Sequence, residues 1–386
     1  MRFPGFSGEW EYITLSEVAS RVTRKNKDNV SKLPLTISAQ YGLVDQISFF
    51  NKVVASADMS NYYLLQKGEF AYNKSYSSDY PWGAIKRLDR YSQGALSSLY
   101  ICFAVNNKVD SDFAVHYFES SKWHREVSNI AGEGARNHGL LNIAVGDFFE
   151  TKHSVPKSKE EQKKIAALLN LITDRITTQI KIIEKLESLI RGISNNLLYS
   201  ESGTPVRLGD ILSERSERTK VNNQHEVLSS TVKGIFSQRE YFSKDIASEN
   251  NVGYKVIRLH DVVLSPQNLW MGNINYNDKF YNGIVSPSYK IFSVADGYDK
   301  RFISAMLKTH RALYNYMLVS EQGASVVRRN LNMEAFEQLV FKMPPIDKQR
   351  EIGNAISALQ SRLELAVRTK TAYEKQKQWL LTQMFI

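Results

Sequence analysis

Two long stretches of the chain carry apolar residues at alternating spacings of four and three positions. A period of 3.5 residues is typical of a helix that packs lengthwise against another helix. The first stretch predicts a helix over 158–202, with polar Gln179 at one position of its apolar seam. The apolar members of this seam are Ile165, Leu169, Ile172, Ile176, Ile183, Leu186, Ile190, Ile193 and Leu197.

The first helix has start and stop signals in the sequence. Ser158 and Glu161 form a capping-box pattern just after Pro156. Gly203 and Pro205 end the pattern. Gly192 lies inside it and weakens the last turns by about 1 kcal/mol relative to alanine.

The second stretch predicts a C-terminal helix over 345–386, with Asp347 as its N-cap after Pro345. Lys370 and Lys377 interrupt its seam. The seam positions are Ile352, Ile356, Leu359, Leu363, Ala366, Tyr373, Leu380 and Met384.

The segments before each helix, 1–157 and 203–344, mix strand-like and helix-like patterns. Residues 98–103 and 289–294 have the alternation and composition of strands. Residues 75–81 and 273–278 are rich in turn formers. We expect one amphipathic helix near 111–129 and another near 299–319.

The chain repeats itself with a period of roughly 190 residues. Leu15–Val18 corresponds to Leu208–Ile211, and Gly94-Ala95-Leu96-Ser97 to Gly283-Ile284-Val285-Ser286. Further matches pair residues 62–70 with 254–262, 141–143 with 331–333, and Pro156 with Pro344 or Pro345. Their shared order indicates two copies of one domain, each followed by a long helix.

A helix of about 43 residues is roughly 60 Å long and cannot bury its seam on its own small domain. The sequence therefore predicts an α+β fold: two similar mixed α/β domains separated by two long antiparallel coiled-coil helices, related by a pseudo-two-fold axis. On periodicity alone, a coiled coil that joins two copies of the chain remains an alternative.

Composition adds a preference for polyanions. The formal net charge is +10 and the pI is near 9.3, which favours a nucleic-acid partner. Cys102 is the single cysteine, so no internal disulfide or thiolate metal site is expected. There is no apolar run of membrane-spanning length and no signal-peptide pattern, which favours a cytoplasmic location and no membrane partner.

Catalytic motifs are weak. The chain has no Asn/Asp-Pro-Pro-Tyr/Phe segment for adenine methylation and no P-loop, and Gly132-Glu133-Gly134 is a poor cofactor turn. Glu150-Thr151-Lys152 has a nuclease-like form, with Asp110 or Asp112 as a further carboxylate. The second copy has apolar residues at that place, Leu339–Phe341. We therefore predict no catalytic and no metal-binding residue in this chain.

The ordered set of motifs resembles the specificity (S) subunits of type I restriction–modification enzymes. The most specific segments are Arg2-Phe3-Pro4-Gly5-Phe6, residues 283–289, Glu161–Ile165 after a proline, Pro344–Ile352, and Leu380–Phe385. The resemblance covers nearly the whole chain. Gly94-Ala95-Leu96-Ser97 departs from the family pattern because no proline follows the serine.

The resemblance implies two target-recognition domains, each reading one half of a bipartite, asymmetric site in double-stranded DNA. The helices would set the spacing between the halves. Two methylation (M) subunits would supply S-adenosylmethionine and methylate adenine at N6, and motor-nuclease (R) subunits would supply ATP with Mg²⁺. This chain would hold no cofactor itself and would serve phage defence as a non-catalytic subunit.

Polar loops at corresponding places of the two domains are the candidate DNA contacts. Arginine suits guanine, and asparagine or glutamine suits adenine, whereas lysine more often binds phosphate. In the first domain the candidates are Lys74, Ser75, Tyr76, Ser77, Lys86, Arg136, Asn137 and His138. In the second they are Lys233, Gln267, Asn268, Trp270, Ser325, Arg328, Arg329 and Asn330.

Two other hypotheses remain beside the specificity subunit. One is a stand-alone coiled-coil DNA-binding or architectural protein. The other is a nuclease centred on Glu150 and Lys152, which Lys152→Ala would inactivate.

Overall fold

The computed structural model describes residues 1–132, 139–197, 203–241, 250–322 and 328–385. The chain divides into two compact units: residues 1–179 with 369–386, and residues 180–368. We call residues 1–157 the first head and residues 203–344 the second head. Each unit therefore contains one head and one end of both long helices.

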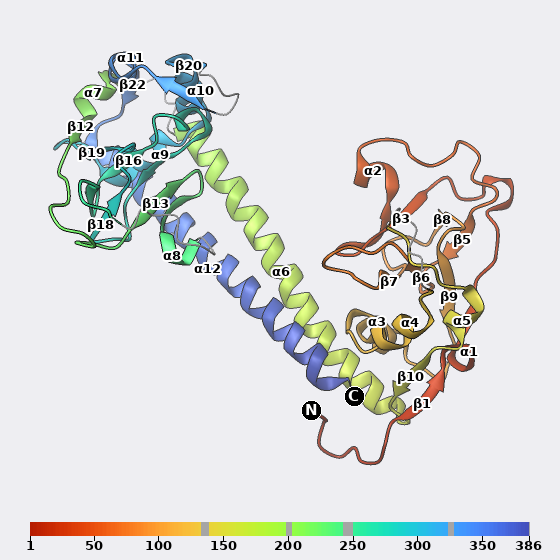
Figure 1. The fold of residues 1–386 in the computed structure, drawn as a ribbon. Helices are drawn as coiled ribbons and strands as arrows, with labels where there is room; N and C mark the ends of the chain where they lie inside the picture. Colours follow the sequence, from red (N-terminus) through yellow and green to blue (C-terminus); the bar gives the residue numbers. More distant parts are fainter. Residues whose placement is uncertain (133–138, 198–202, 242–249, 323–327, 386) are drawn as a thin grey trace. The chain divides into compact units, whose positions relative to one another are not determined.

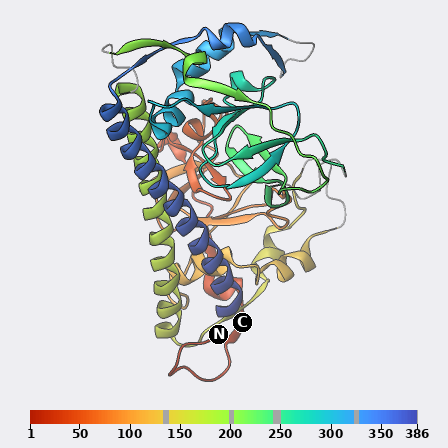
Figure 2. The ribbon, with the colours of Figure 1, turned by 90° about the vertical axis from the view of Figure 1, so that its left-hand side faces the viewer.

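The long helices are α6 (Lys159–Leu197) and α12 (Ile346–Met384). Within each unit, their segments lie side by side and run in opposite directions (Figures 1 and 2). Ile165, Leu169 and Ile172 are buried in one core with Leu380 and Met384, and the Arg175 guanidinium lies over the Tyr373 ring at 5.7 Å. The predicted antiparallel coiled coil is confirmed.

The remaining seam positions are also shielded from solvent. Ile352 and Ile356 are buried in the core of the second head. The half-buried seam positions are Ile176, Ile183, Leu186, Ile190, Ile193, Leu359, Leu363 and Tyr373. The side chain of Leu197 lies outside the described residues. None of the described helices is long and apolar enough to cross a membrane.

The start of α6 differs from a full capping box. Ser158 Oγ accepts the N–H of Glu161 at 3.3 Å, as expected. The Glu161 carboxylate, however, accepts two hydrogen bonds from Arg2, at 2.7 and 2.8 Å, and it is 1% exposed. Arg2 belongs to the opening motif, so two motifs far apart in the sequence meet here as a bidentate ion pair.

The predicted N-cap of α12 was wrong. The helix begins at Ile346, and Asp347 lies in its first turn, where it pairs with Arg350 at 3.2 Å. Pro345 precedes the helix, and its carbonyl accepts the N–H of Gln349 at 3.0 Å. A proline is well suited to this boundary because it has no N–H to leave unsatisfied.

The first head contains sixteen short elements before α6. In chain order they are β1 (Glu11–Thr14), α1 (Leu15–Val18), β2 (Ala19–Arg21), η1 (Lys27–Asn29), β3 (Pro34–Ser38), β4 (Gly42–Asp45), α2 (Gln46–Phe50), β5 (Tyr63–Gln66), β6 (Phe70–Asn73), β7 (Ala84–Arg87), β8 (Gln93–Leu96), β9 (Ile101–Val105), α3 (Ser111–Glu119), α4 (His124–Ile130), α5 (Val145–Phe149) and β10 (Lys152–Val155) among the described residues.

The second head follows the same plan. Its elements are β11 (Thr204–Arg207), α7 (Leu208–Ile211), β12 (Leu212–Arg215), β13 (Leu228–Thr231), β14 (Gly234–Ser237), α8 (Gln238–Tyr241), β15 (Lys255–Arg258), β16 (Val262–Leu264), η2 (Leu269–Met271), β17 (Ile274–Tyr276), β18 (Asn282–Val285), β19 (Lys290–Val294), α9 (Lys300–Leu307), α10 (His310–Leu318), β20 (Ser320–Gln322), β21 (Arg329–Leu331), α11 (Met333–Glu337) and β22 (Val340–Met343).

Strand order shows that the two heads are copies of one fold. One of the two four-stranded sheets of the first head has the order β2-β9-β6-β7, and the four-stranded sheet of the second head has the order β12-β19-β16-β17. Strand pairs β1–β10 and β11–β22 correspond in the same way. The predicted internal repeat is therefore confirmed.

The repeated glycine of the two heads has a packing cause. A Cβ on Gly94 would lie 2.4 Å from Leu35 Cδ1, and one on Gly283 would lie 2.2 Å from Leu228 Cδ1. Each leucine comes from the first strand of the head's β-hairpin, β3 or β13. The motif therefore preserves a place where only glycine leaves room for a buried leucine.

Two local predictions were wrong. The single helices expected near 111–129 and 299–319 are each broken in two, as α3 and α4 and as α9 and α10. The break is stabilised by a hydroxyl in each head: Ser120 Oγ donates to the Tyr117 carbonyl at 2.6 Å, and Thr309 Oγ1 to the Met306 carbonyl at 2.9 Å. Such local bonds compete with continued helix.

The segment 273–278 is not a turn, because it contains strand β17, which pairs with β16. Ile274 is buried, and the side chains of Asn273 and Asn275 bond to Ser230 and its backbone. The asparagines indicated a turn in the sequence, but here they satisfy buried polar groups.

A glutamine at the start of each long helix fixes its head. Gln162 Oε1 accepts the N–H of Asp110 at 2.6 Å, and Gln162 Nε2 donates to the Pro156 carbonyl at 2.8 Å. Gln349 makes the same two bonds, to Asp299 at 3.0 Å and to Pro344 at 2.8 Å. Both glutamines are buried, so each head is held to its helix by one repeated polar contact.

Candidate nucleic-acid interface

In the first head, the predicted loop 74–77 directly follows β6 and lies beside residues 139–141. The carbonyl of Lys74 accepts the N–H of Leu141 at 2.9 Å, and the N–H of Tyr76 donates to Gly139 at 3.0 Å. Ser75, Tyr76 and Ser77 are exposed. Two backbone hydrogen bonds thus hold this loop as an exposed polar edge.

The corresponding loop of the second head follows β16 and lies beside β21. The N–H of Arg329 donates to the Gln267 carbonyl at 3.1 Å, and the Arg329 guanidinium stacks over the Trp270 ring at 4.8 Å. Gln267, Arg328 and Asn330 are exposed. The structure therefore brings two predicted segments together, 267–270 and 328–330.

Polar atoms are left unsatisfied at this place. Asn268 Oδ1 and Arg329 Nε are buried and have no hydrogen-bond partner among the described residues. A buried unpaired polar atom costs about 1–3 kcal/mol, so its presence calls for an explanation. Stacking on an aromatic ring holds the guanidinium plane in a fixed orientation, as base recognition requires.

Four candidate residues, Arg136, Asn137, His138 and Ser325, lie outside the described residues.

Lys86 lies apart from the other candidates. Its side chain is 18% exposed, and its ammonium is 3.8 Å from Glu119, which also pairs with Lys377 of α12 at 2.8 Å. Despite burial, the two lysines and His116 hold the pKa of the Glu119 carboxyl far below its usual value. Lys86 therefore neutralises an internal carboxylate, and we do not propose it further as a phosphate contact.

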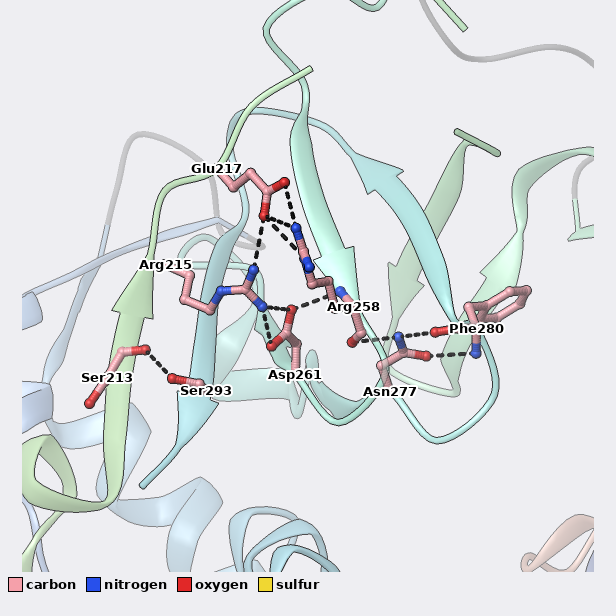
Figure 3. Close-up of polar contacts among 8 residues, drawn as sticks. All are labelled: Ser213, Arg215, Glu217, Arg258, Asp261, Asn277, Phe280 and Ser293. Carbon is pink, nitrogen blue, oxygen red and sulfur yellow. Dashed lines mark hydrogen bonds and ion pairs between the residues drawn. The ribbon is translucent and has the colours of Figure 1, made fainter. Parts of the chain in front are cut away.

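Two arginines of the second head are also neutralised internally (Figure 3). Arg215 donates to both oxygens of Asp261 at 2.8 Å and to Glu217 at 3.0 Å, and Arg258 binds Glu217 at 2.9 Å. The first head has an equivalent contact between Arg24 and Glu69 at 2.8 Å. These arginines stabilise the turns at β5–β6 and β15–β16 and are not free cations.

Lys233 occupies the exposed turn of the β13–β14 hairpin. Its neighbour Val232 lies close to Gly272, which directly follows η2. Helix α10 packs on the same η2. Lys233, the 267–270 loop and Arg329 therefore belong to one region of the second head.

Sequence reasoning missed two features of the heads. Lys308, between α9 and α10, bonds to the same hairpin turn through its ammonium. In the first head, Tyr41, Phe49 and Phe50 form an exposed aromatic cluster, with Phe49 and Phe50 ring centroids 5.0 Å apart. The basic run at 308–311 was a signal for the first feature. The aromatics looked like core residues in the sequence.

The two upstream carboxylates of the nuclease hypothesis, Asp110 and Asp112, have structural roles. Asp110 caps α3, accepting the N–H groups of Asp112 and Phe113 at 3.1 Å, and Asp112 pairs with Arg87 at 2.7 Å. Lys152 lies in β10 opposite Thr14. Among the described residues, no group of three or more His, Cys, Asp or Glu side chains is placed to hold a metal ion.

The fold defines a class of protein in which two copies of one mixed α/β head are each joined to an antiparallel helix pair. This is the fold of the S subunits of type I restriction–modification systems, and the resemblance found in the sequence is confirmed at the level of the fold.

The comparison rests on solved structures. An S subunit of a type I restriction–modification system from M. genitalium matches with a TM-score of 0.63 and 14% sequence identity, over 100% of this chain and 99% of that chain. A chain from a structure on complex assembly and conformational transition of the type I R-M system matches with a TM-score of 0.51 and 15% identity, over 98% of this chain and 97% of that one. No family model and no curated protein matches the sequence.

Proposed function

We propose that this chain is the DNA-specificity subunit of a type I restriction–modification complex. It reads a bipartite, asymmetric site in double-stranded DNA, one half with each head, and it is not itself an enzyme. Two methylation subunits carry S-adenosylmethionine and modify adenine, and motor-nuclease subunits use ATP and Mg²⁺. The observation that carries this proposal is the duplicated head, found in a fold shared with S subunits over the whole chain.

Differences between the heads support an asymmetric target. Loop 267–270 contains Trp270 stacked with Arg329, whereas loop 74–77 of the first head contains Tyr76 between two serines. Backbone contacts to DNA carry no sequence information, but side chains that reach base edges do. Equivalent loops with different side chains are therefore suited to two different half-sites.

Exposed apolar residues on the long helices support the proposal that other subunits bind this chain. In the first unit, Leu171 is 61% exposed and Trp379 is 55% exposed; in the second unit, Leu365 is 65% exposed. These residues lie off the seam that pairs α6 with α12. Covering such side chains with a partner removes apolar surface from water, which is favourable. We assign these positions to the methylation subunits.

The direct test combines the chain with its proposed methylation subunits and maps modified adenines on genomic DNA. We expect methylation at one bipartite sequence. The chain alone should transfer no methyl group from S-adenosylmethionine and should cut no DNA.

Methyl transfer by the isolated chain would refute the proposal. Sequence-independent binding of DNA, with no methylation subunit able to join the chain, would instead favour a stand-alone architectural protein. Metal-dependent cutting abolished by Lys152→Ala would favour the nuclease.

A further inference from the structure

Lys308 of the second head holds its ammonium against neutral acceptors. Nζ donates to Asn275 Oδ1 at 2.5 Å and to the Val232 carbonyl at 3.3 Å. Among the described residues, no carboxylate lies within 4 Å of this nitrogen. The residue as a whole is exposed, whereas burial around the ammonium lowers the pKa of Lys308 to about 8. Near pH 7 the ammonium is still mostly protonated, so it keeps its charge for a ligand.

Asn275 is fixed in the orientation that serves Lys308. Its amide nitrogen donates to the Thr231 carbonyl and to Ser230 Oγ, both at 2.7 Å, and the side chain is buried. The remaining polar atom, Oδ1, therefore faces the lysine. Asn275 acts as a positioning residue that directs the ammonium to the hairpin turn.

The equivalent position in the first head has a carboxylate beside the lysine, which the surroundings of Lys308 lack among the described residues. The repeat pairs Asn275 with Lys86 and Lys308 with Glu119, since each pair is separated by 189 positions and lies on equivalent elements. In the first head the lysine neutralises a carboxylate. In the second head the positive charge has no such partner, and an anion would supply one.

The surroundings of Lys308 add positive charge. Lys233 is exposed in the hairpin turn whose Val232 carbonyl binds Lys308. Gly272, which directly follows η2, lies close to both Val232 and Leu313. The hairpin turn that binds Lys308 is therefore near η2, which contains Trp270, the residue that packs on Arg329.

We propose that Lys308, with Lys233 beside it, binds a backbone phosphate of the DNA and so sets the position of the second head on its half-site. This inference rests on the proposed function and adds a named phosphate site to it. A phosphate contact fixes register without reading sequence, while the neighbouring 267–270 loop reaches the bases.

The test measures binding of the full chain to a labelled double-stranded DNA over a range of salt concentrations. Each phosphate contact contributes about 0.9 to the slope of log affinity against log salt. We expect Lys308→Met to lower that slope by about 0.9 and to weaken binding equally for unrelated sequences. Lys279→Met is the matched control, since Lys279 of the same head already pairs with Glu364 at 3.3 Å.

The outcomes separate this inference from the proposed function. If the wild-type chain binds DNA and Lys308→Met has the same slope as Lys279→Met, the phosphate site is refuted and the proposed function stands. If Lys308→Met keeps the wild-type slope but no longer binds the methylation subunits, Lys308 belongs to a protein contact and the inference is also refuted. Failure of the wild-type chain to bind any DNA counts against the proposed function itself.

Discussion

At the scale of residues, buried polar groups in the heads are matched by neighbours from distant elements. His153 of β10 is 3% exposed and lies between Tyr117 and Thr151. Thr151 Oγ1 donates to the Phe148 carbonyl at 2.6 Å, so it accepts from His153 Nε2 at 2.9 Å. The Tyr117 hydroxyl, 3.1 Å away, then donates to Nδ1. This pattern requires a neutral imidazole.

Acid is therefore expected to destabilise the first head through His153. Burial lowers the pKa of His153 to about 4 from 6.5. Because the folded-state pKa is lowered, the unfolded chain binds the proton more readily, and stability falls as the pH drops from 6.5 toward 4. Between pH 7 and pH 5 the loss is about 2 kcal/mol.

Chemical unfolding at the two pH values measures this loss. The variant His153→Gln should show a smaller loss, and His310→Gln, which removes an exposed histidine of the second head, should behave as wild type. An unchanged acid dependence in His153→Gln would exclude this residue as its source.

The repeated glycine provides a second prediction at this scale. Gly283→Ala brings a methyl group into the space of Leu228, and overpacking of this kind costs about 1–3 kcal/mol. Thermal unfolding should show the loss. Gly146→Ala is the control, because a Cβ there meets nothing within 4 Å. Equal stability of the two variants would contradict the packing explanation.

At the scale of elements, the two heads keep one plan with different side chains. The first head buries Trp123, the N-cap of α4, and Val127 within α4, and the second head buries Ala312 and Tyr316 of α10 at the equivalent positions. One head places its large aromatic residue a turn earlier than the other. Packing of a core tolerates such exchanges when the total volume is similar, so strand order is conserved while the sequences diverge.

The helices also use polar positions that the seam pattern could not explain. Lys377 interrupts the α12 seam because Glu119 of α3 binds it at 2.8 Å, and Lys370 pairs with Glu374 at 2.8 Å. Lys377 thus helps to hold the first head on α12, and Lys370 forms an ion pair within the helix.

Helix length is expected to set the spacing of the DNA site. An insertion of four residues after Gln179, with a matched insertion in α12, adds about 6 Å of helix. We expect the spacer between the half-sites to change while both half-site sequences remain. Mapping methylated adenines measures this, and Gly192→Ala, which alters no length, serves as the control. An unchanged spacer would exclude the helices as the element that sets it.

At the scale of the whole molecule, each head forms a unit with one end of both helices. The contacts that join head and helix are repeated: Gln162 in the first unit and Gln349 in the second. The first unit adds a contact that the second lacks among the described residues, the pair of Arg2 with Glu161. A head can therefore be exchanged if these joining residues are kept.

If the proposed function holds, replacing residues 1–155 by the first head of a known S subunit should change one half-site only. The second head and its loop 267–270 are untouched by the exchange, so the other half-site and its methylation should persist. Adenine mapping with the chimaera checks this. Changes in both half-sites would mean that the heads do not read DNA independently.

The sequence by itself determined the duplication, the two long helices and their seams. These follow from periodicity, which depends on local geometry and on the need of each helix to bury one face. It also located the loops 74–77 and 267–270, because polar residues interrupted structured segments at equivalent places. The sequence did not predict the start of α12 or the breaks in the shorter helices, because helix ends depend on single hydrogen bonds.

Only the tertiary structure decided which charges are free. Lys86 and Lys308 look alike in the sequence, but one meets Glu119 and the other meets Asn275 and a carbonyl. Pairing of this kind joins strands and helices that are tens of residues apart, and no local pattern records it. The fold therefore neutralises some of the cations behind the overall charge of +10 and leaves others available, and the positions of the available ones determine where a polyanion can bind.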